Sequence, residues 1–208
     1  PMPRRDEDSH EILGTFKILS NRAEMIRVPT SPEELFAILS HRHTILLEGR
    51  PHMNPGVFKM KNNRAGQTEF VDYQLVKGTL SQGFKYYSAL TDPFARAIFM
   101  MFMISEVHPF NDGNGRIARV MMNAEFVRAD QSRIIVPTVF REDYILALRK
   151  LTRHKDPMAY INVMTKLHQF SDNLYGTDFT ELKNYLAACN AYEEPSQAKL
   201  QIIDRSII

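Results

Sequence analysis

Hydrophobic residues recur three and four positions apart along much of the chain, which is the spacing of one face of an α-helix. The clearest example begins at Ser31, which can cap a helix, with Pro32 at the first position and Glu34 three residues after the cap. This pattern predicts a helix over about residues 32–48. Its apolar positions are Leu35, Ile38, Leu39, Ile45 and Leu46.

A second helix is predicted to begin at Asp92 and Pro93, and it is apolar on nearly all sides, as buried central helices are. It should end at His108, because a residue that precedes a proline avoids the helical region. The remaining patterns predict helices over about residues 113–129, 141–155, 157–167 and 178–190. Residues 1–29 are mixed in character and give no clear pattern.

Only one part of the chain has the pattern of paired strands. Residues 57–60 and 68–71 are two short strand-like runs, and the segment between them, 61–67, is rich in Asn and Gly. Two strands alone are marginally stable, so this pair should lean on helices. The sequence therefore predicts a mainly α fold with one β-hairpin.

The composition is that of an ordinary globular protein. Of 208 residues, 44% are hydrophobic and 24% charged, and the formal net charge of +2 is too small to indicate nucleic acid or an anionic membrane as a partner. The longest apolar run, at 97–104, is far shorter than the roughly 20 residues of a membrane-spanning helix. The one cysteine, Cys189, forms no internal disulfide, which fits a reducing, cytoplasmic setting.

The residues with the most chemical content are those from His108 to Arg119. His108 follows a helix and can project into a cleft, where an imidazole of ordinary pKa suits proton abstraction from an alcohol. A lone histidine is more often a core or capping residue, and the other six histidines keep that interpretation. Phe110, the least polar member of the loop, is expected to plug into the core and fix the shape of the loop.

The polar residues of this stretch suit a phosphate ligand. Asp112 can hold a magnesium ion, although it can equally be a turn or cap residue. Gly113 and Gly115 at the start of a helix expose backbone N–H groups that bind anions, and Asn114 can add its amide. Two arginines follow, three residues apart on one face of the predicted helix. They can form a solvated basic stripe, but planar guanidinium groups that follow an anion site suit phosphate oxygens better. The two arginines are Arg116 and Arg119.

Three rival sites fail on the residues themselves. A calcium-binding EF-hand loop that starts at Asp112 needs an oxygen ligand at its fifth position and a glutamate at its twelfth, where the chain has Arg116 and Asn123. The P-loop pattern is absent, and no cluster of Cys and His suits zinc.

The same stretch resembles the signature of the Fic family, His-x-Phe-x-Asp/Glu-Gly-Asn-Gly-Arg-x-x-Arg, and matches it at every fixed position. The resemblance covers about residues 31–167 and implies a helical core with the signature between two central helices and a β-hairpin, the flap, that docks a target protein. The domains it implies are an N-terminal extension at 1–30, a Fic core at 31–170 with the flap at 56–71 and the motif at 108–119, and a helical C-terminal extension at 171–208.

Family members with this full signature usually transfer AMP from ATP to a Ser, Thr or Tyr hydroxyl of a target protein, with release of pyrophosphate. The resemblance therefore implies a nucleotidyltransferase, a protein adenylyltransferase, that uses ATP and Mg²⁺. It implies that His108 is the general base, that Asp112 binds Mg²⁺, and that Gly113, Asn114, Gly115, Arg116 and Arg119 hold the phosphates.

Outside the signature the resemblance is less specific. It places Phe58 and Lys59 of the flap against the target segment. Tyr144 is similar to a family tyrosine near the adenine, although it can equally be a core residue, and Ile145 stands where many relatives have a second aromatic. For Gly66, Gln67 and Thr68, closing over the nucleotide and forming a simple turn stay equally open.

Many relatives carry an inhibitory helix, Ser/Thr-x-x-x-Glu-Gly/Asn, whose glutamate pairs with the second arginine of the signature, here Arg119. Residues 44–49 match these letters, with Glu48 as the glutamate. They lie just before the flap, and we interpret the match as a coincidence. An inhibitor supplied by another protein, such as an antitoxin, stays open, as does a homodimer.

Two other functions stay open at this stage. One keeps the fold and changes the chemistry, to removal of AMP or to transfer of another nucleotide or phosphate group. The other is a non-catalytic module whose flap binds a peptide, which would have little use for Asp112 and both arginines. Neither nucleic acid nor a membrane is expected as a partner.

Overall fold

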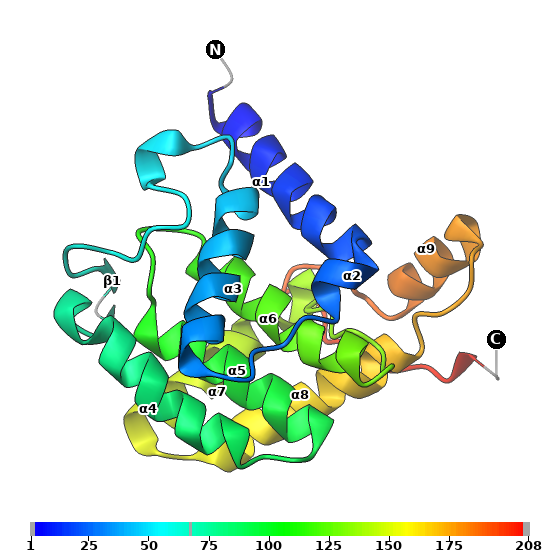
Figure 1. Cartoon of the computed structure of the whole chain (residues 1–208). Helices are drawn as coiled ribbons and strands as arrows, with labels where there is room; N and C mark the ends of the chain where they lie inside the picture. Colours follow the sequence, from blue (N-terminus) through cyan, green and yellow to red (C-terminus); the bar gives the residue numbers. More distant parts are fainter. Residues whose placement is uncertain (1–2, 67, 206–208) are drawn as a thin grey trace. The chain divides into compact units, whose positions relative to one another are not determined.

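The computed structural model describes residues 3–66 and 68–205. At the centre of the first part of the chain, α5 (Pro93–Val107) and α6 (Asn114–Arg128) pack against each other along their lengths (Figure 1). Both are buried on most sides, as the apolar pattern of the first of them predicted. The loop that joins them, residues 108–113, is the start of the sequence signature.

The other elements of this part surround that pair. They are α1 (Pro3–Ser20), α2 (Arg22–Met25), α3 (Pro32–Leu46), the 3₁₀ turns η1 (Pro51–Met53) and η2 (Tyr73–Leu75), the strands β1 (Arg64–Ala65) and β2 (Thr68–Glu69), and α4 (Val76–Ser88). α4 packs on α5, α3 packs on α6, and α1 lies against α3 and α6. The N-terminal helix α1 is thus part of the wall next to the signature.

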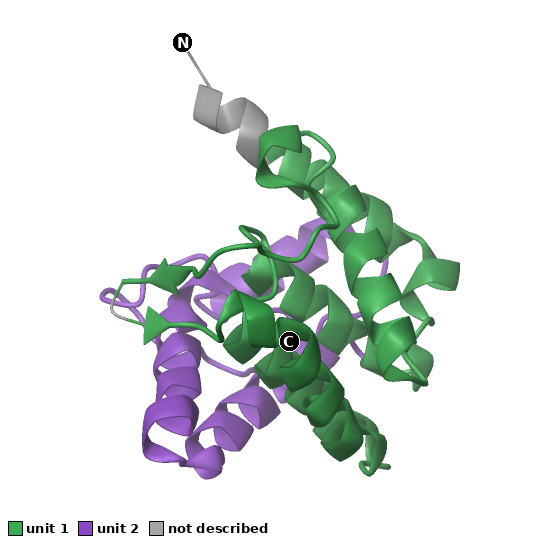
Figure 2. Ribbon diagram, turned by 60° about the vertical axis from the view of Figure 1, so that its left-hand side comes forward, with its two compact units in different colours: residues 1–131 green, residues 132–208 purple. Residues whose placement is uncertain are grey.

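The chain divides into two compact units, residues 1–131 and 132–208 (Figure 2). The second unit contains η3 (Thr138–Phe140), α7 (Arg141–His154), α8 (Pro157–Asp172) and α9 (Phe179–Ala188). Within it, α7 packs on α8. Its single cysteine, Cys189, is buried and is not in a disulfide.

The capping residues form the helix starts that the sequence predicted. The Ser31 hydroxyl accepts the N–H of Glu34 at 3.1 Å, and the Asp92 carboxylate accepts the N–H of Ala95 at 2.7 Å. The capping box differs in one contact, because the Glu34 carboxylate accepts the N–H of Thr30 at 2.7 Å, one residue before the cap. Satisfied N–H groups at the first turn are what fix these helix starts.

The mainly helical prediction is confirmed, and so are the helices expected from 32, 93, 113, 141, 157 and 178. Among the described residues, three α-helices were not predicted, α1, α2 and α4. The hairpin is shorter than predicted and is displaced along the chain. Its strands pair Arg64 with Glu69 and Ala65 with Thr68, so residues 57–60, predicted as a strand, have no partner strand. Instead, the N–H of Lys59 donates to the carbonyl of Pro109 in the signature loop at 2.8 Å.

No helix in the part of the chain that the structure describes has both the length and the apolar character needed to cross a membrane.

A fully buried arginine ties α3 to the segment before it. The guanidinium of Arg42 donates to the Glu24 carboxylate at 3.0 Å and to the backbone carbonyls of Glu24 and Arg27 at 2.6 and 2.8 Å. Burial lowers the pKa of Arg42, and the Glu24 carboxylate opposes that shift. Such a buried charge is expensive to remove, because the carbonyls of Glu24 and Arg27 lose their donor and the buried Glu24 carboxylate keeps only half-exposed or exposed partners such as Arg27.

We therefore expect Arg42→Ala to lower the free energy of unfolding by about 3–5 kcal/mol, the usual cost of removing one partner of a buried pair. Urea unfolding followed by circular dichroism measures this change. Arg22→Ala is the matched control, because Arg22 pairs with Asp130 on the exposed surface, where a pair is worth about 0–1 kcal/mol. A similar loss of unfolding free energy in the two variants would contradict the stabilising role assigned to Arg42.

Candidate active site

His108 lies at the C-terminal end of α5, in a left-handed backbone conformation with φ of 49°. Its backbone N–H still donates to the carbonyl of Ile104 at 2.9 Å, so it caps the helix, and the chain then turns into Pro109. The left-handed conformation is uncommon for a residue other than glycine. A proline next in sequence ends the helix at the residue where the sequence predicted.

The tautomer of His108 follows from the hydrogen bond that its Nδ1 forms. Nδ1 lies 3.2 Å from the carbonyl oxygen of Ser105, which can only accept, so Nδ1 carries the proton and Nε2 keeps its lone pair. Burial lowers the pKa of His108 to about 4, the Ser105 carbonyl and Asp112 oppose the shift, and Lys59 adds to it. The imidazole is therefore neutral near pH 7, with Nε2 available to take a proton.

The loop after His108 is held by Asn114. Its side-chain amide donates to the carbonyl of Phe110 at 2.8 Å, and its side-chain oxygen accepts the N–H of Phe110 at 2.9 Å. Asn114 is buried and both groups of its amide are used, so it shapes the loop. The sequence analysis expected this amide to face phosphate, and the structure places it inward.

Phe110 is fully buried, as expected for the residue that anchors the loop. The ring of His43 from α3 stacks on it with centroids 3.7 Å apart and planes within 4°. His43 accepts the N–H of Gly56 at Nδ1, at 2.9 Å, so its Nε2 carries the proton and donates to the carbonyl of Asp112 at 3.0 Å. Burial lowers the pKa of His43, which favours the neutral ring that these two bonds need.

Gly113 is the residue where the loop enters α6, with φ of 73°. A Cβ there would lie 3.2 Å from the side chain of Leu46 and 3.4 Å from that of His43, so both the backbone and the space favour glycine. Gly115, in the first turn of the helix, is exposed and has ordinary helical backbone. The N–H of Arg116 donates to the carbonyl of Gly113 at 3.1 Å. The N–H groups before it in the first turn, those of Asn114 and Gly115, have no intrahelical acceptor in an α-helix, and an anion would be stabilised there.

Asp112 lies just before that turn with its side chain 42% exposed. One carboxylate oxygen accepts the N–H of Gly113 at 2.7 Å, and the other pairs with the guanidinium of Arg50 at 2.7 Å. No group of three or more His, Cys, Asp and Glu that could enclose a metal occurs among the described residues. A magnesium ion held by Asp112 would take its other oxygens from phosphate and water, which is its usual pattern.

The first signature arginine is already occupied by an acidic side chain. Arg116 forms an ion pair with Glu11 of α1. The other oxygen of the same carboxylate binds Arg50 at 2.5 Å, and only 2% of the Glu11 side chain is exposed. Glu11, Arg50, Arg116 and Asp112 thus form one chain of alternating charges, which we call the acid–arginine chain. Arg119 is half-buried, one turn further along α6.

The segment before the hairpin is tied to the end of α5. Lys59 is buried, and its ammonium donates to the Asn63 side chain at 2.7 Å and to the carbonyl of Val107 at 3.2 Å. Asn63 in turn donates to the carbonyl of Phe110 at 2.9 Å. The sequence analysis placed Lys59 against a target, but its charge is used internally, near the C-terminal end of a helix, where cations are favoured.

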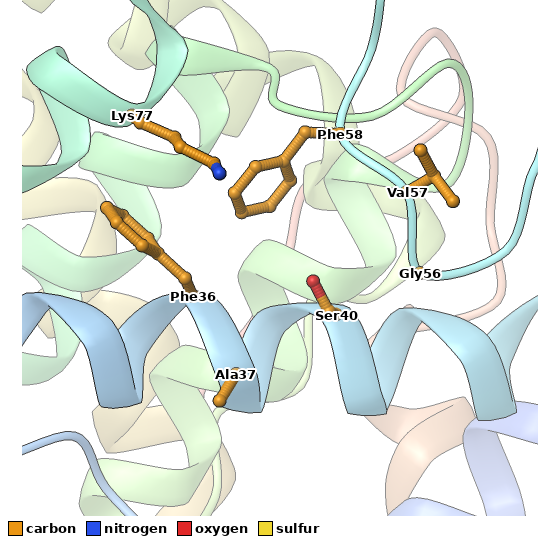
Figure 3. Close-up of a pocket in the computed structure, with 7 residues that line it drawn as sticks. All are labelled: Phe36, Ala37, Ser40, Gly56, Val57, Phe58 and Lys77. Carbon is orange, nitrogen blue, oxygen red and sulfur yellow. The ribbon is translucent and has the colours of Figure 1, made fainter.

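Phe58 points the other way and lines a pocket of about 580 Å³. Figure 3 shows its ring near Phe36 of α3, with the ammonium of Lys77 from α4 close by. The Phe58 ring also lies 5.2 Å, between centroids, from Phe110 of the signature loop. The pocket wall is therefore in direct contact with the residue that fixes the loop. The remaining lining residues are Ala37, Ser40, Gly56 and Val57.

The tip of the hairpin is close to solvent. Gly66 is exposed, has a φ of 59° and has open space around it, and Thr68 is half-buried in β2. Gln67 lies outside the described residues. The backbone at Gly66 fits the tight turn between the strands, so the turn interpretation of this segment describes what the structure contains.

Two further candidates from the sequence are Glu48 and Tyr144. Glu48 is 67% exposed and pairs with Lys17 of α1 at 2.5 Å. Tyr144 is on α7 in the second unit and is buried there. Sequence analysis missed Glu11, Arg50, His43 and Phe70, which contact the signature loop from other elements. Their only signal in the sequence was residue type, because each contact joins segments far apart in the chain.

Comparison with known proteins shows similarity over the central part of the chain. Residues 30–125 match the model of the Fic/DOC family. Protein adenylyltransferase fic-1 of Caenorhabditis elegans is 30% identical over 115 residues, which are 54% of this chain and 22% of the nematode protein. A Fido domain-containing protein of Dictyostelium discoideum is 28% identical over 107 residues, which are 49% of this chain and 75% of that protein.

Solved structures show the same fold. A Fic-1 fragment from Caenorhabditis elegans superposes with a TM-score of 0.63 at 18% identity, over 87% of this chain and 52% of the fragment. A Fic domain-containing signaling protein from Bacteroides thetaiotaomicron gives 0.59 at 18% identity, over 88% of this chain and 67% of the other. The chain thus has a Fic-like helical fold with a small antiparallel hairpin, and its residues 30–125 are similar to the Fic/DOC family. It is distantly related to protein adenylyltransferases, and it spans about a fifth of the length of the nematode relative.

Proposed function

We propose that this chain is a protein adenylyltransferase, which transfers AMP from ATP to a hydroxyl group of a target protein. The observation that carries the proposal is the loop between α5 and α6. It holds an imidazole with a free Nε2, a carboxylate and the open start of a helix followed by Arg116, all fixed by buried contacts. The relatives named protein adenylyltransferases support AMP as the group transferred.

The reaction assigns one task to each group. Nε2 of His108 takes the proton of the target hydroxyl as its oxygen bonds to the α-phosphorus, and the bond from that phosphorus to the bridging oxygen breaks, releasing pyrophosphate. The start of α6, Arg116 and Arg119 stabilise the negative charge on the phosphates, and the buried loop holds its groups in place beforehand. Tyr144 keeps its proposed place near the adenine.

Asp112 is the residue that would hold magnesium, and a magnesium ion bound with ATP supplies positive charge to the phosphate oxygens. Asp112 suits a magnesium site that the nucleotide completes. In such sites the protein usually supplies one or two carboxylates, and Asp112 is an exposed carboxylate next to a helix start. For Asp112 to bind there, its oxygen must leave Arg50. Entry of the nucleotide and rearrangement of the acid–arginine chain are therefore linked.

We further propose that the conformation described is a closed one, with Glu11 at a position that a phosphate would use. A carboxylate and a phosphate compete for the same guanidinium groups, and the Glu11 carboxylate is buried between two of them. This assigns to Glu11 of α1 the inhibitory role that the letters 44–49 suggested for Glu48. An inhibitory partner protein would then act by holding α1 in place.

For the target, we propose the pocket beside Phe58 as the docking place of the segment that carries the hydroxyl. Its apolar wall is in contact with Phe110, and hence with the signature loop, through Phe58. Lys77 at its edge forms no ion pair with the described side chains and would favour an acidic residue near the modified hydroxyl. This location replaces Lys59, whose charge is buried.

The experiment that tests the function uses two labels on ATP in a cell lysate with Mg²⁺ and the purified chain. Label from the α-phosphate that appears on protein, with none from the γ-phosphate, supports transfer of AMP. Label from the γ-phosphate alone would instead show phosphate transfer. Absence of both labels, also with Glu11→Ala, would favour the non-catalytic module, and loss of AMP from pre-labelled protein would favour the reverse reaction. Mass spectrometry of the labelled band then identifies the target.

A further inference from the structure

The ring of Phe70 lies flat on the imidazole of His108. Their centroids are 3.6 Å apart and their planes are within 5° of parallel, a closer and more parallel pair than the Phe58–Phe110 contact nearby. Phe70 follows β2 directly, so the ring comes from the base of the hairpin. One face of the candidate base is thereby covered by a side chain that is not part of the signature.

Phe70 is fixed by the same segment that holds the signature loop. Its N–H donates to the carbonyl of Asn63 at 3.3 Å, and the Asn63 side chain donates to the carbonyl of Phe110 at 2.9 Å and, at 3.4 Å, to that of His108. The Lys59 ammonium bound to Asn63 completes the anchor. The position of the phenyl ring relative to the imidazole is thus set by hydrogen bonds on both sides of the contact.

The stack with Phe70 restricts a tilt of the His108 ring that its hydrogen bond to the Ser105 carbonyl allows. The bond from Nδ1 to the Ser105 carbonyl fixes the tautomer, but a single hydrogen bond at 3.2 Å leaves the ring free to tilt about it. A parallel phenyl ring opposes that tilt and excludes water from one imidazole face. The charged groups that act on this imidazole are Lys59 and Asp112, one of each sign.

We propose that Phe70 is a positioning residue for the general base, holding the His108 ring in one plane and keeping it dry while the Ser105 carbonyl holds its tautomer. This inference rests on the proposed function for the role of His108, although the stack itself does not. Because Phe70 belongs to the hairpin base, the hairpin and the base are mechanically coupled. A displaced hairpin would leave His108 less well aligned.

The test compares Phe70→Ala with the conservative variant Phe70→Tyr, which keeps a flat ring. Tyr73→Ala is the matched control, because it removes a partly exposed aromatic side chain close by that does not stack on His108. The His108 pKa is measured by NMR titration of the imidazole in each protein. Transfer is then measured as kcat and as KM for ATP, and thermal melting checks that each variant is folded.

We expect the pKa of His108 to be about 4 in the parent chain and to rise toward 6.5 in Phe70→Ala, because water regains access to the ring. Phe70→Tyr and Tyr73→Ala should keep the low value. Misplacement of a reacting group by about 1 Å can cost on the order of 100-fold. We therefore expect kcat to fall up to about that far in Phe70→Ala, with KM for ATP little changed.

An unchanged His108 pKa in folded Phe70→Ala would overturn the proposal, as would equal effects of Phe70→Ala and Tyr73→Ala. A rise in KM for ATP with kcat retained would also overturn it, because that split indicates a loss of nucleotide binding. The NMR arm needs no turnover. If the parent chain and Glu11→Ala show no transfer of label, the proposed function fails, and the pKa comparison still decides whether Phe70 controls the environment of His108.

Discussion

His108→Ala is expected to remove detectable transfer of AMP while leaving the fold intact. General-base catalysis typically contributes about 10²–10⁴-fold to a rate, and alanine has no group that could take the proton from the target hydroxyl. The His108 side chain does not neutralise a buried charge. The backbone N–H of an alanine at this position can still donate to the carbonyl of Ile104. Transfer of α-label to protein, measured beside thermal melting, separates loss of chemistry from loss of folding.

The matched control for this prediction is His154→Ala, an exposed histidine at the end of α7 in the second unit. It should transfer label at the parent rate. The prediction would be contradicted by a folded His108→Ala that transfers AMP within a few-fold of the parent chain. In that case the imidazole at the end of α5 would not be the base, whatever binds at the start of α6.

The second large effect is expected from Glu11→Ala. Removing this buried carboxylate takes away the acidic partner of Arg116 and one acidic partner of Arg50, so phosphate oxygens no longer compete with the Glu11 carboxylate. A coupling between two ligands of one site is commonly worth about 5–150-fold in affinity. We expect Glu11→Ala to bind Mg²⁺–ATP more tightly by a factor in that range and to transfer AMP faster.

Glu48→Ala provides the control that the chain itself offers. Glu48 fits the letters of an inhibitory motif, yet it is exposed and pairs with Lys17 on the surface, where an ion pair contributes little. Its removal should leave ATP affinity near the parent value. If Glu48→Ala activates and Glu11→Ala does not, the pattern of letters is the better guide and the assignment of Glu11 is wrong.

The helical architecture could be predicted because its signals are local. Caps such as Ser31 and Asp92 act within three residues, and the apolar spacing of α5 directly reflects its burial on most sides. The motif loop was found for the same reason, as its residues are contiguous. α1 escaped prediction because its buried face has no apolar stripe. The buried positions include Glu11, Gly14 and Ile18, and only one of these is a large apolar residue.

What could not be predicted depends on contacts between distant segments. The run at 57–60 has the composition of a strand, but its Lys59 N–H is taken by the carbonyl of Pro109, so no partner strand forms there. The Lys59 ammonium can be buried because the Val107 carbonyl, at the end of α5, and the Asn63 side chain accept hydrogen bonds from it. Asn114 turns its amide to the loop backbone for a similar reason, since a buried backbone needs partners.

Isothermal titration calorimetry of the Glu11→Ala chain with Mg²⁺–ATP tests most directly whether the loop between α5 and α6 binds a nucleoside triphosphate. We expect heat of binding with one nucleotide per chain, weaker binding by the parent chain, and loss of this heat when Arg116→Ala is added. Absence of binding heat in the parent chain and in Glu11→Ala alike would contradict it.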